Sequence, residues 1–302
     1  MSRPAPHPGT TPTRVPADWP HRGHSRSVAA AGLEWHVQCF GAGPTVLLLH
    51  GSGASAHSWA ELMPTLADRG TVVAPDLPGH GWTLGARLSD LSLPQVAAAL
   101  QKLLEALALP APALVVGHSA GAALALRWAL SHQPGGGARL LGFNPSLVPP
   151  PAVYTRLLGP IVTPLATSSP VASLVAGWGS RAGLVRRLLA STGSTLSPAQ
   201  QARYETLFRR PDHVRGSMGF MAAADLDALM GAAEPLGRRC HFVIGERDAW
   251  VPAAALHRVI GRALPDAGVE AWSGGHLLHE VEPARAAATV LDHLARTTPA
   301  SP

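Results

Sequence analysis

Residues 113–130 read ALVVGHSAGAALALRWAL, and this stretch decides the fold. The run ALVV at 113–116 is short and continuously apolar, as expected for a strand buried on both faces. A helical pattern follows over residues 122–130. Between the two, GHSAG at 117–121 brackets a serine with glycines, so we expect a sharp turn that lifts the Ser119 hydroxyl above the sheet edge.

Ser119 is the candidate nucleophile, and a serine needs a base to take its proton at neutral pH. The best candidate is His276, in a glycine-rich loop between a predicted strand at 268–272 and a predicted helix that begins at Pro283. His279 is the alternative, although a structural role suits it better. The residues expected to support the turn are Gly117, His118 and Gly121.

The base needs an anion that holds its tautomer, and Asp248 has the right position. It follows the apolar run HFVIG at 241–245, and the order serine, aspartate, histidine along the chain is that of one triad-bearing fold. Glu246 on the same loop is the rival carboxylate. The other place where this fold can hold an acid carries Asn144, which has no charge to supply.

The loop after TVLLL at 45–49 is the candidate oxyanion hole. We expect the backbone N–H of Ser52, with Gly53 as the alternative, and that of Ala120 to face the developing charge. Pocket support is expected from His50, Gly51 and Gly53. The loop DLPGHG at 76–81 is expected to shape the sheet edge and not to take part in chemistry.

Strand-like and helix-like segments alternate up to residue 130 and again from residue 240, which predicts a mostly parallel sheet flanked by helices. Leucines and other apolar residues at helical spacing predict a helix over 93–107, with Ser92 and Gln95 as a capping box. The predicted units are a flexible segment 1–24, a core of 25–144 with 236–298, and an inserted helical cap 145–235 that roofs the site.

The composition excludes several classes of protein. Hydrophobic residues make up 46% of the 302 residues and charged ones 14%, which is too apolar for disorder, and no clean apolar run is long enough to span a membrane. The net charge of +5 comes without a basic patch, so no nucleic acid is expected. Two cysteines without metal spacing and no export signal indicate a cytoplasmic protein with neither metal nor cofactor.

The motifs HGSGAS, DLPGHG, GHSAG, GERDAWVP and GGHLLHEVEP resemble the α/β-hydrolase superfamily over residues 26–296. The resemblance implies an α/β-hydrolase fold with an eight-stranded sheet. It also implies that Cys39 and Cys240 lie on distant strands and do not pair.

A narrower resemblance rests on DWPHR at 18–22 and GLEWHVQ at 32–38, with HGSGASAHSW and GHSAGAALALR. These segments are similar to the BchO-type magnesium-chelatase accessory proteins of bacteriochlorophyll biosynthesis. The resemblance implies a role in phototrophic tetrapyrrole synthesis, with a porphyrin intermediate as the apolar ligand and chelatase subunits as partners. The basic and somewhat apolar composition is compatible with a place at the membrane periphery. The alternative is a freestanding serine hydrolase that cleaves an ester, thioester or carbon–carbon bond of an apolar substrate.

Overall fold

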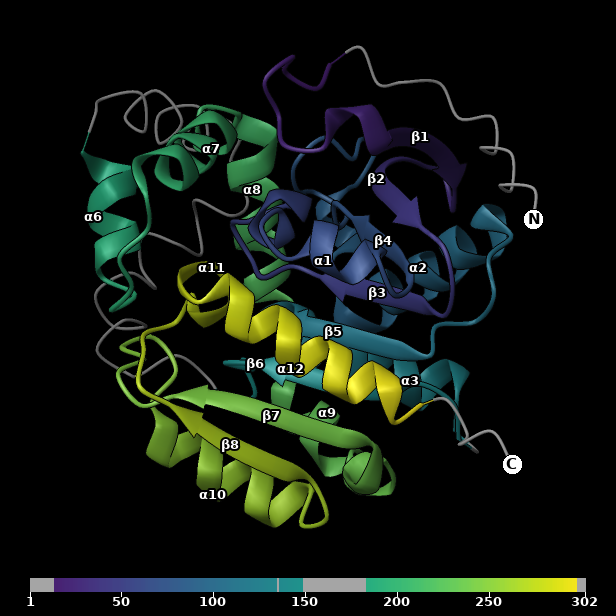
Figure 1. Cartoon of the computed structure of the whole chain (residues 1–302), viewed down its shortest axis with the longest axis vertical. Coiled ribbons are helices and arrows are strands. Elements are labelled where there is room, and N and C mark those ends of the chain that lie inside the picture. Colours follow the sequence, from purple (N-terminus) through teal and green to yellow (C-terminus); the bar gives the residue numbers. More distant parts are fainter. Residues whose placement is uncertain (1–13, 135, 149–182, 298–302) are drawn as a thin grey trace.

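A computed structural model of the chain describes residues 14–134, 136–148 and 183–297. Its centre is an eight-stranded sheet in the order β1-β2-β4-β3-β5-β6-β7-β8 (Figure 1). Only the pairs β1·β2 and β2·β4 are antiparallel, so the predicted α/β-hydrolase fold with a mostly parallel sheet is confirmed. The strands are β1 (Ser25–Ala30), β2 (Leu33–Gly41), β3 (Thr45–Leu49), β4 (Thr71–Pro75), β5 (Leu114–His118), β6 (Arg139–Phe143), β7 (Cys240–Gly245) and β8 (Gly268–Trp272).

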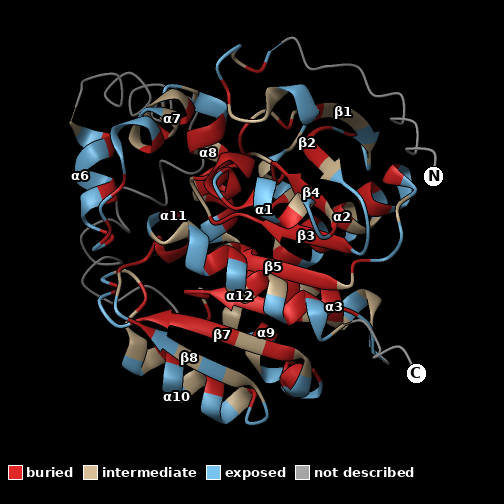
Figure 2. Ribbon diagram, in the orientation of Figure 1, coloured by how far each residue is buried: buried red, intermediate tan, exposed pale blue. Residues whose placement is uncertain are grey.

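Helices cover both faces of the sheet, and the central strands are buried from end to end (Figure 2). One face packs mainly against α2, α3, α9 and α10, and the other against α1 and α12. The helices of the core are α1 (Met63–Ala67), α2 (Leu93–Leu107), α3 (Ala120–His132), α10 (Ala253–Ala263), α11 (Leu278–Val281) and α12 (Pro283–Ala295). Short 3₁₀ helices are η1 (Arg22–His24), η2 (Ala56–Trp59), η3 (Leu88–Asp90) and η4 (Glu234–Arg239).

Strand β3 shows why the sequences of the central strands are apolar at every position and do not alternate with polar residues. Val46 and Leu48 point into one core cluster, whereas Leu47 and Leu49 point into the other. Because side chains alternate along a strand and both faces are covered, every position must be apolar. The parallel register then brings the carboxyl ends of β3, β5, β6, β7 and β8 to one edge of the sheet.

The helix predicted over 93–107 is confirmed as α2, but its predicted capping box is wrong. Ser92 stands at the N-cap, yet its Oγ donates to Oε1 of Gln95 at 2.8 Å and makes no bond to the backbone. The two polar side chains therefore satisfy each other at the surface, where water can serve the free N–H groups of the first turn.

The N-terminal segment differs from the predicted flexible lead-in, because residues 14–24 pack against the body of the protein. Val15 and Trp19 are buried against Leu207, and the Gln38 side chain donates to Pro20 O at 2.6 Å. Packing partners from distant parts of the chain order this stretch, and local sequence does not reveal them. Residues 1–13 lie outside the described residues.

Four helices follow residue 183 in the region predicted as a cap: α6 (Leu184–Ala190), α7 (Pro198–Phe208), α8 (Pro211–Ala222) and α9 (Leu226–Gly231). Helices α6 and α7 lie on the side of the sheet where β7 and β8 end (Figure 1). Residues 149–182 lie outside the described residues, so the extent of the cap remains a prediction.

Cys39 on β2 and Cys240 on β7 are buried and free, and four strands separate them in the sheet. The inference that they do not pair is confirmed. Across the three described ranges, no helix has the length and apolarity needed to cross a membrane.

Candidate active site

Ser119 lies at the tip of the turn between β5 and α3, with φ 52° and ψ −119°. The turn is tight enough to require both flanking glycines. A Cβ on Gly117 would collide with the backbone of Ala122, and one on Gly121 would collide with the carbonyls of Leu49 and His50. A non-glycine residue at positive φ is strained by about 1–3 kcal/mol, and here the surrounding backbone contacts enforce it.

Three sequence-predicted side chains meet at this turn. His276 Nε2 lies 3.0 Å from Ser119 Oγ, and His276 Nδ1 lies 2.7 Å from Asp248 Oδ2. Asp248 is fixed in turn, because its Oδ1 accepts hydrogen bonds from the N–H groups of Trp250 and Val251 at 2.8 and 2.9 Å. A carboxylate on Nδ1 leaves Nε2 unprotonated and able to accept the serine proton.

The structure separates the candidates from their rivals. Glu246 is exposed on the same loop as Asp248, and its N–H donates to Trp272 O. His279 is fully buried and packs against Trp59 and His118, with ring centroids 4.4 Å away in both cases. Neither rival lies in the hydrogen-bond chain to Ser119.

The predicted oxyanion loop lies directly against the nucleophile. A Cβ on Gly51 would come within 3.1 Å of Ser119 Cβ, so the backbone of residues 51–53 passes next to the serine. Ala120 is the first residue of α3, where an N–H has no partner within the helix. The loop also reaches the cap region, because Ser52 Oγ donates to Ser217 O at 2.9 Å and His213 Nε2 lies 3.1 Å from Gly53 O. The oxyanion role of Ser52 and Ala120 stays a prediction.

Asn144 and His118 hold the histidine loop, a role that the sequence reasoning missed. Asn144 Nδ2 donates to the carbonyls of Gly275 and His276 at 2.8 and 2.9 Å, and its Oδ1 accepts from Gly245 N at 2.5 Å. His118 Nε2 lies 2.9 Å from the same His276 carbonyl. The place of Asn144 directly after β6, at the edge where the other site residues gather, was the signal that could have identified it.

Residues from the predicted cap fix the same loop from the other side. Thr192 O accepts from His276 N at 2.9 Å, and Ser194 Oγ accepts from Leu277 N at 2.9 Å. Gly193 and Gly275 approach so closely that a Cβ on Gly275 would overlap the Gly193 backbone. The segment after α6 is thus part of the support for the candidate base.

Burial sets the charge state of the groups beneath the site. It lowers the pKa of His118 well below its usual value, and together with the charge of His276 it lowers the pKa of His279 to about 3. Burial also raises the pKa of Glu280 to about 8. Tyr204 on α7 donates to Glu280 Oε1 at 2.5 Å, which ties the cap region to α11. At neutral pH His118, His279 and Glu280 are therefore uncharged.

No cluster of three or more histidine, cysteine, aspartate or glutamate side chains suited to a metal ion occurs among the residues that the structure describes. The side chains gathered at Ser119 are a hydroxyl, an imidazole and a carboxylate. Such a set can perform acyl transfer without further groups.

The chain belongs to the alpha/beta hydrolase family, whose model matches residues 46–289. The fold is shared with solved structures of an epoxide hydrolase, with a TM-score of 0.72 and 18% identity over 91% of this chain and 99% of the other, and of a thermophilic esterase from Thermogutta terrifontis, with 0.69 and 18% over 90% and 98%. At such identities the likeness concerns the fold alone.

A nearer relative is the magnesium-chelatase 30 kDa subunit of Rhodobacter capsulatus. It is 35% identical over 285 residues, which is 94% of this chain and 99% of that protein. Within the hydrolases the chain therefore belongs to the family of this subunit, and the BchO-type resemblance of the sequence motifs is confirmed.

Proposed function

We propose that this protein is a serine hydrolase in which Ser119 is the nucleophile, His276 the general base and Asp248 the residue that orients the base. The observation that carries the proposal is the continuous hydrogen-bond chain of 3.0 Å and 2.7 Å through His276. A protein that only binds a ligand has no need of all three groups in this order. The strained backbone of Ser119 further supports a functional role.

The reaction follows from the positions of the protons. His276 Nε2 takes the proton of Ser119 as Oγ bonds to the carbonyl carbon of the substrate, and the carbonyl oxygen becomes an oxyanion. Backbone N–H groups of Ser52 and Ala120 stabilise that charge. His276 then gives its proton to the leaving group, whose bond to the carbonyl carbon breaks and leaves the acyl group on Ser119. His276 next takes a proton from a water as the water oxygen bonds to the acyl carbon. It returns this proton to Ser119 Oγ as the bond between Oγ and the acyl carbon breaks, which releases the acid.

The test is covalent labelling of the serine by a fluorophosphonate probe. Labelling is expected for the wild-type protein and for Ser27→Ala, which removes a hydroxyl on β1 that donates to Glu34 Oε1. Ser119→Ala is expected to lose labelling completely. Undiminished labelling of Ser119→Ala would place the nucleophile elsewhere and overturn the assignment.

We further propose that the biological role is that of a magnesium-chelatase accessory protein in bacteriochlorophyll synthesis, in the cytoplasm or at the membrane periphery. Its ligand is then an apolar porphyrin intermediate and its partners are chelatase subunits. The support is the similarity to the R. capsulatus subunit along 99% of that protein. A role in photosynthetic pigment synthesis follows from this proposal.

A deletion strain tests the biological role. Accumulation of protoporphyrin on deletion is expected, and complementation with Ser119→Ala then shows whether hydrolysis matters. Normal pigment in the deletion strain, together with an intact labelling reaction, would favour the freestanding hydrolase of an apolar ester, thioester or carbon–carbon bond.

A further inference from the structure

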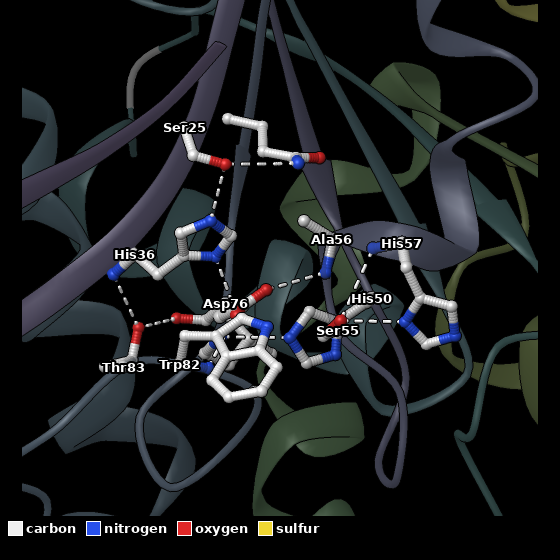
Figure 3. A network of polar contacts seen from close by, with 12 residues as sticks. Ser25, His36, His50, Ser55, Ala56, His57, Asp76, Trp82 and Thr83 are labelled. Carbon is white, nitrogen blue, oxygen red and sulfur yellow. Dashed lines mark hydrogen bonds and ion pairs between the residues drawn. The ribbon is translucent and has the colours of Figure 1, made fainter. Parts of the chain in front are cut away.

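Asp76, which directly follows β4, is the centre of a buried polar network beside the candidate oxyanion loop (Figure 3). Its carboxylate is inaccessible to solvent. Oδ1 accepts from Ala56 N at 2.8 Å, whereas Oδ2 accepts from Trp82 N and from His36 Nδ1, both at 2.8 Å. One carboxylate thus joins strand β2, the loop after β3 and the loop after β4.

The oxyanion loop is held at its other end by His50. The ring Nε2 of His50 accepts from Leu77 N at 2.9 Å, so Nδ1 carries the proton and donates to Gly51 O at 2.8 Å. Residues 50–56 are therefore tied to consecutive residues, Asp76 and Leu77, at both ends. The segment between the ties contains Ser52 and passes against Ser119.

We propose that Asp76 is a positioning residue for the hydrolytic reaction, which holds the backbone of residues 50–56 so that the Ser52 N–H faces the oxyanion. The inference rests on the proposed function of Ser119. It assigns a reaction-related role to the loop at residues 76–81, for which the sequence indicated only a part in shaping the sheet edge.

The surroundings of Asp76 are built for an ionised side chain. Burial alone raises the pKa of this carboxyl, but the charge and hydrogen bond of His36 and the Ala56 N–H hold it below its usual range. Gly81 lies at φ 51°, and a Cβ there would overlap the carboxylate. Charge-assisted hydrogen bonds to backbone N–H groups are short and strong, which suits a device that fixes a loop.

The chain Ser25, His36, Asp76 repeats the residue order of the candidate site, but its serine cannot meet a substrate. Ser25 is 5% exposed, and its Oγ lies 2.9 Å from His36 Nε2 inside the network (Figure 3). What distinguishes Asp76 is its bond to Ala56 N, since this is the contact that reaches the loop beside Ser119. The useful variants therefore act on that bond.

Two variants break the tie to the loop. Asp76→Asn replaces the carboxylate by an amide that cannot accept from all three donors. Ala56→Pro replaces the N–H that Asp76 accepts by a ring carbon, which breaks this contact while the side chains of Asp76 and His36 are retained. Ala56 is the first residue of η2, where proline is tolerated, and Ser55 before it is extended at φ −153° and ψ −172°.

The matched control is Thr83→Val. Thr83 Oγ1 donates to Asp76 O and accepts from His36 N. Valine at this position therefore disturbs the same buried network but leaves the contact between Asp76 and residues 50–56 in place. Each protein is measured for kcat and KM with a p-nitrophenyl ester, for inhibition by a boronic acid that forms a tetrahedral adduct with the serine, and for thermal unfolding. Should Asp76→Asn fail to fold, Ala56→Pro still provides the measurement.

Asp76→Asn and Ala56→Pro are expected to lower kcat about 10- to 100-fold with KM changed less than about threefold, since a misplaced oxyanion donor acts on the transition state. Boronic acid inhibition should weaken by a similar factor. Thr83→Val should lose thermal stability and keep kcat within about twofold. Wild-type kcat in Ala56→Pro, or an equal loss in Thr83→Val, overturns the positioning role alone, whereas a wild-type protein that the fluorophosphonate does not label overturns the proposed function as well.

Discussion

Replacing Asp248 with asparagine tests whether the carboxylate sets the tautomer of His276. The Oδ1 of Asp248 accepts two backbone N–H groups, from Trp250 and Val251, and the Oδ2 accepts one N–H from His276. An asparagine keeps the two backbone bonds only if its NH₂ group faces the imidazole. His276 must then accept at Nδ1 and carry its proton on Nε2, where it cannot take the proton of Ser119.

The expected loss in kcat is about 10³- to 10⁴-fold, with the upper value being about the loss found when the corresponding aspartate of a Ser-His-Asp protease is replaced by asparagine. Such a loss corresponds to about 4–5.5 kcal/mol of transition-state stabilisation, since each tenfold is worth about 1.36 kcal/mol. The assay is kcat on a p-nitrophenyl ester together with the rate of fluorophosphonate labelling.

Glu246→Gln is the matched control, because Glu246 is a second carboxylate on the same loop and is exposed. It is expected to keep kcat within about twofold of the wild-type value. A kcat for Asp248→Asn within tenfold of wild type, or a comparable loss in Glu246→Gln, would refute the assignment of Asp248 as the partner of His276.

Two further perturbations test the support around the site. Asn144→Ala removes the side-chain partner of the Gly275 carbonyl and the Gly245 N–H, and leaves the His276 carbonyl with His118. The free energy of unfolding in urea should therefore fall by about 3 kcal/mol and kcat by about tenfold. An unchanged kcat would show that the histidine loop keeps its position without Asn144. The free energy of unfolding should also peak near pH 6.5. Burial lowers the pKa values of His213 and His279 to about 3, so both histidines stay neutral in the folded protein. Their contribution to the free energy of unfolding is complete above about pH 6.5. It is lost on acidification, by up to about 1.4 kcal/mol for each histidine and pH unit. Glu280 changes the free energy of unfolding in the opposite direction, because burial raises its pKa to about 8. The stability that its neutral form contributes is lost as the pH rises from about 4.5 through 8. A free energy of unfolding in urea that did not change between pH 5 and 8.5 would contradict both assignments.

The turn at Ser119, the strands and helix α2 could be predicted because each depends on local chemistry. An uninterrupted apolar run such as TVLLL leaves few alternatives to a strand covered on both faces. Glycines on both sides of Ser119 correspond to positions where the structure leaves no room for a Cβ. The choice of His276 and Asp248 was also possible, because residues at the carboxyl ends of parallel strands gather at one edge of the sheet.

Prediction from local sequence failed for residues whose role depends on contacts with distant parts of the chain. Val15 and Trp19 lie in a proline-rich stretch without periodicity, and only Leu207 and Trp82 make that stretch a packed part of the molecule. Asn144 carries no charge and for that reason attracted no role, yet its amide satisfies three backbone groups on two loops.

From its amino acids alone, the chain specifies the sheet, the strained serine turn and the identities of the three groups that meet there, because turn geometry and burial patterns act over a few residues. The tertiary structure decides which backbone carbonyls accept side-chain hydrogen bonds, which histidines stay neutral and which backbone N–H groups donate to Asp76. Those properties depend on desolvation and on hydrogen-bond partners as far as 165 residues apart, as between Ser52 and the Ser217 carbonyl, and no local pattern encodes them.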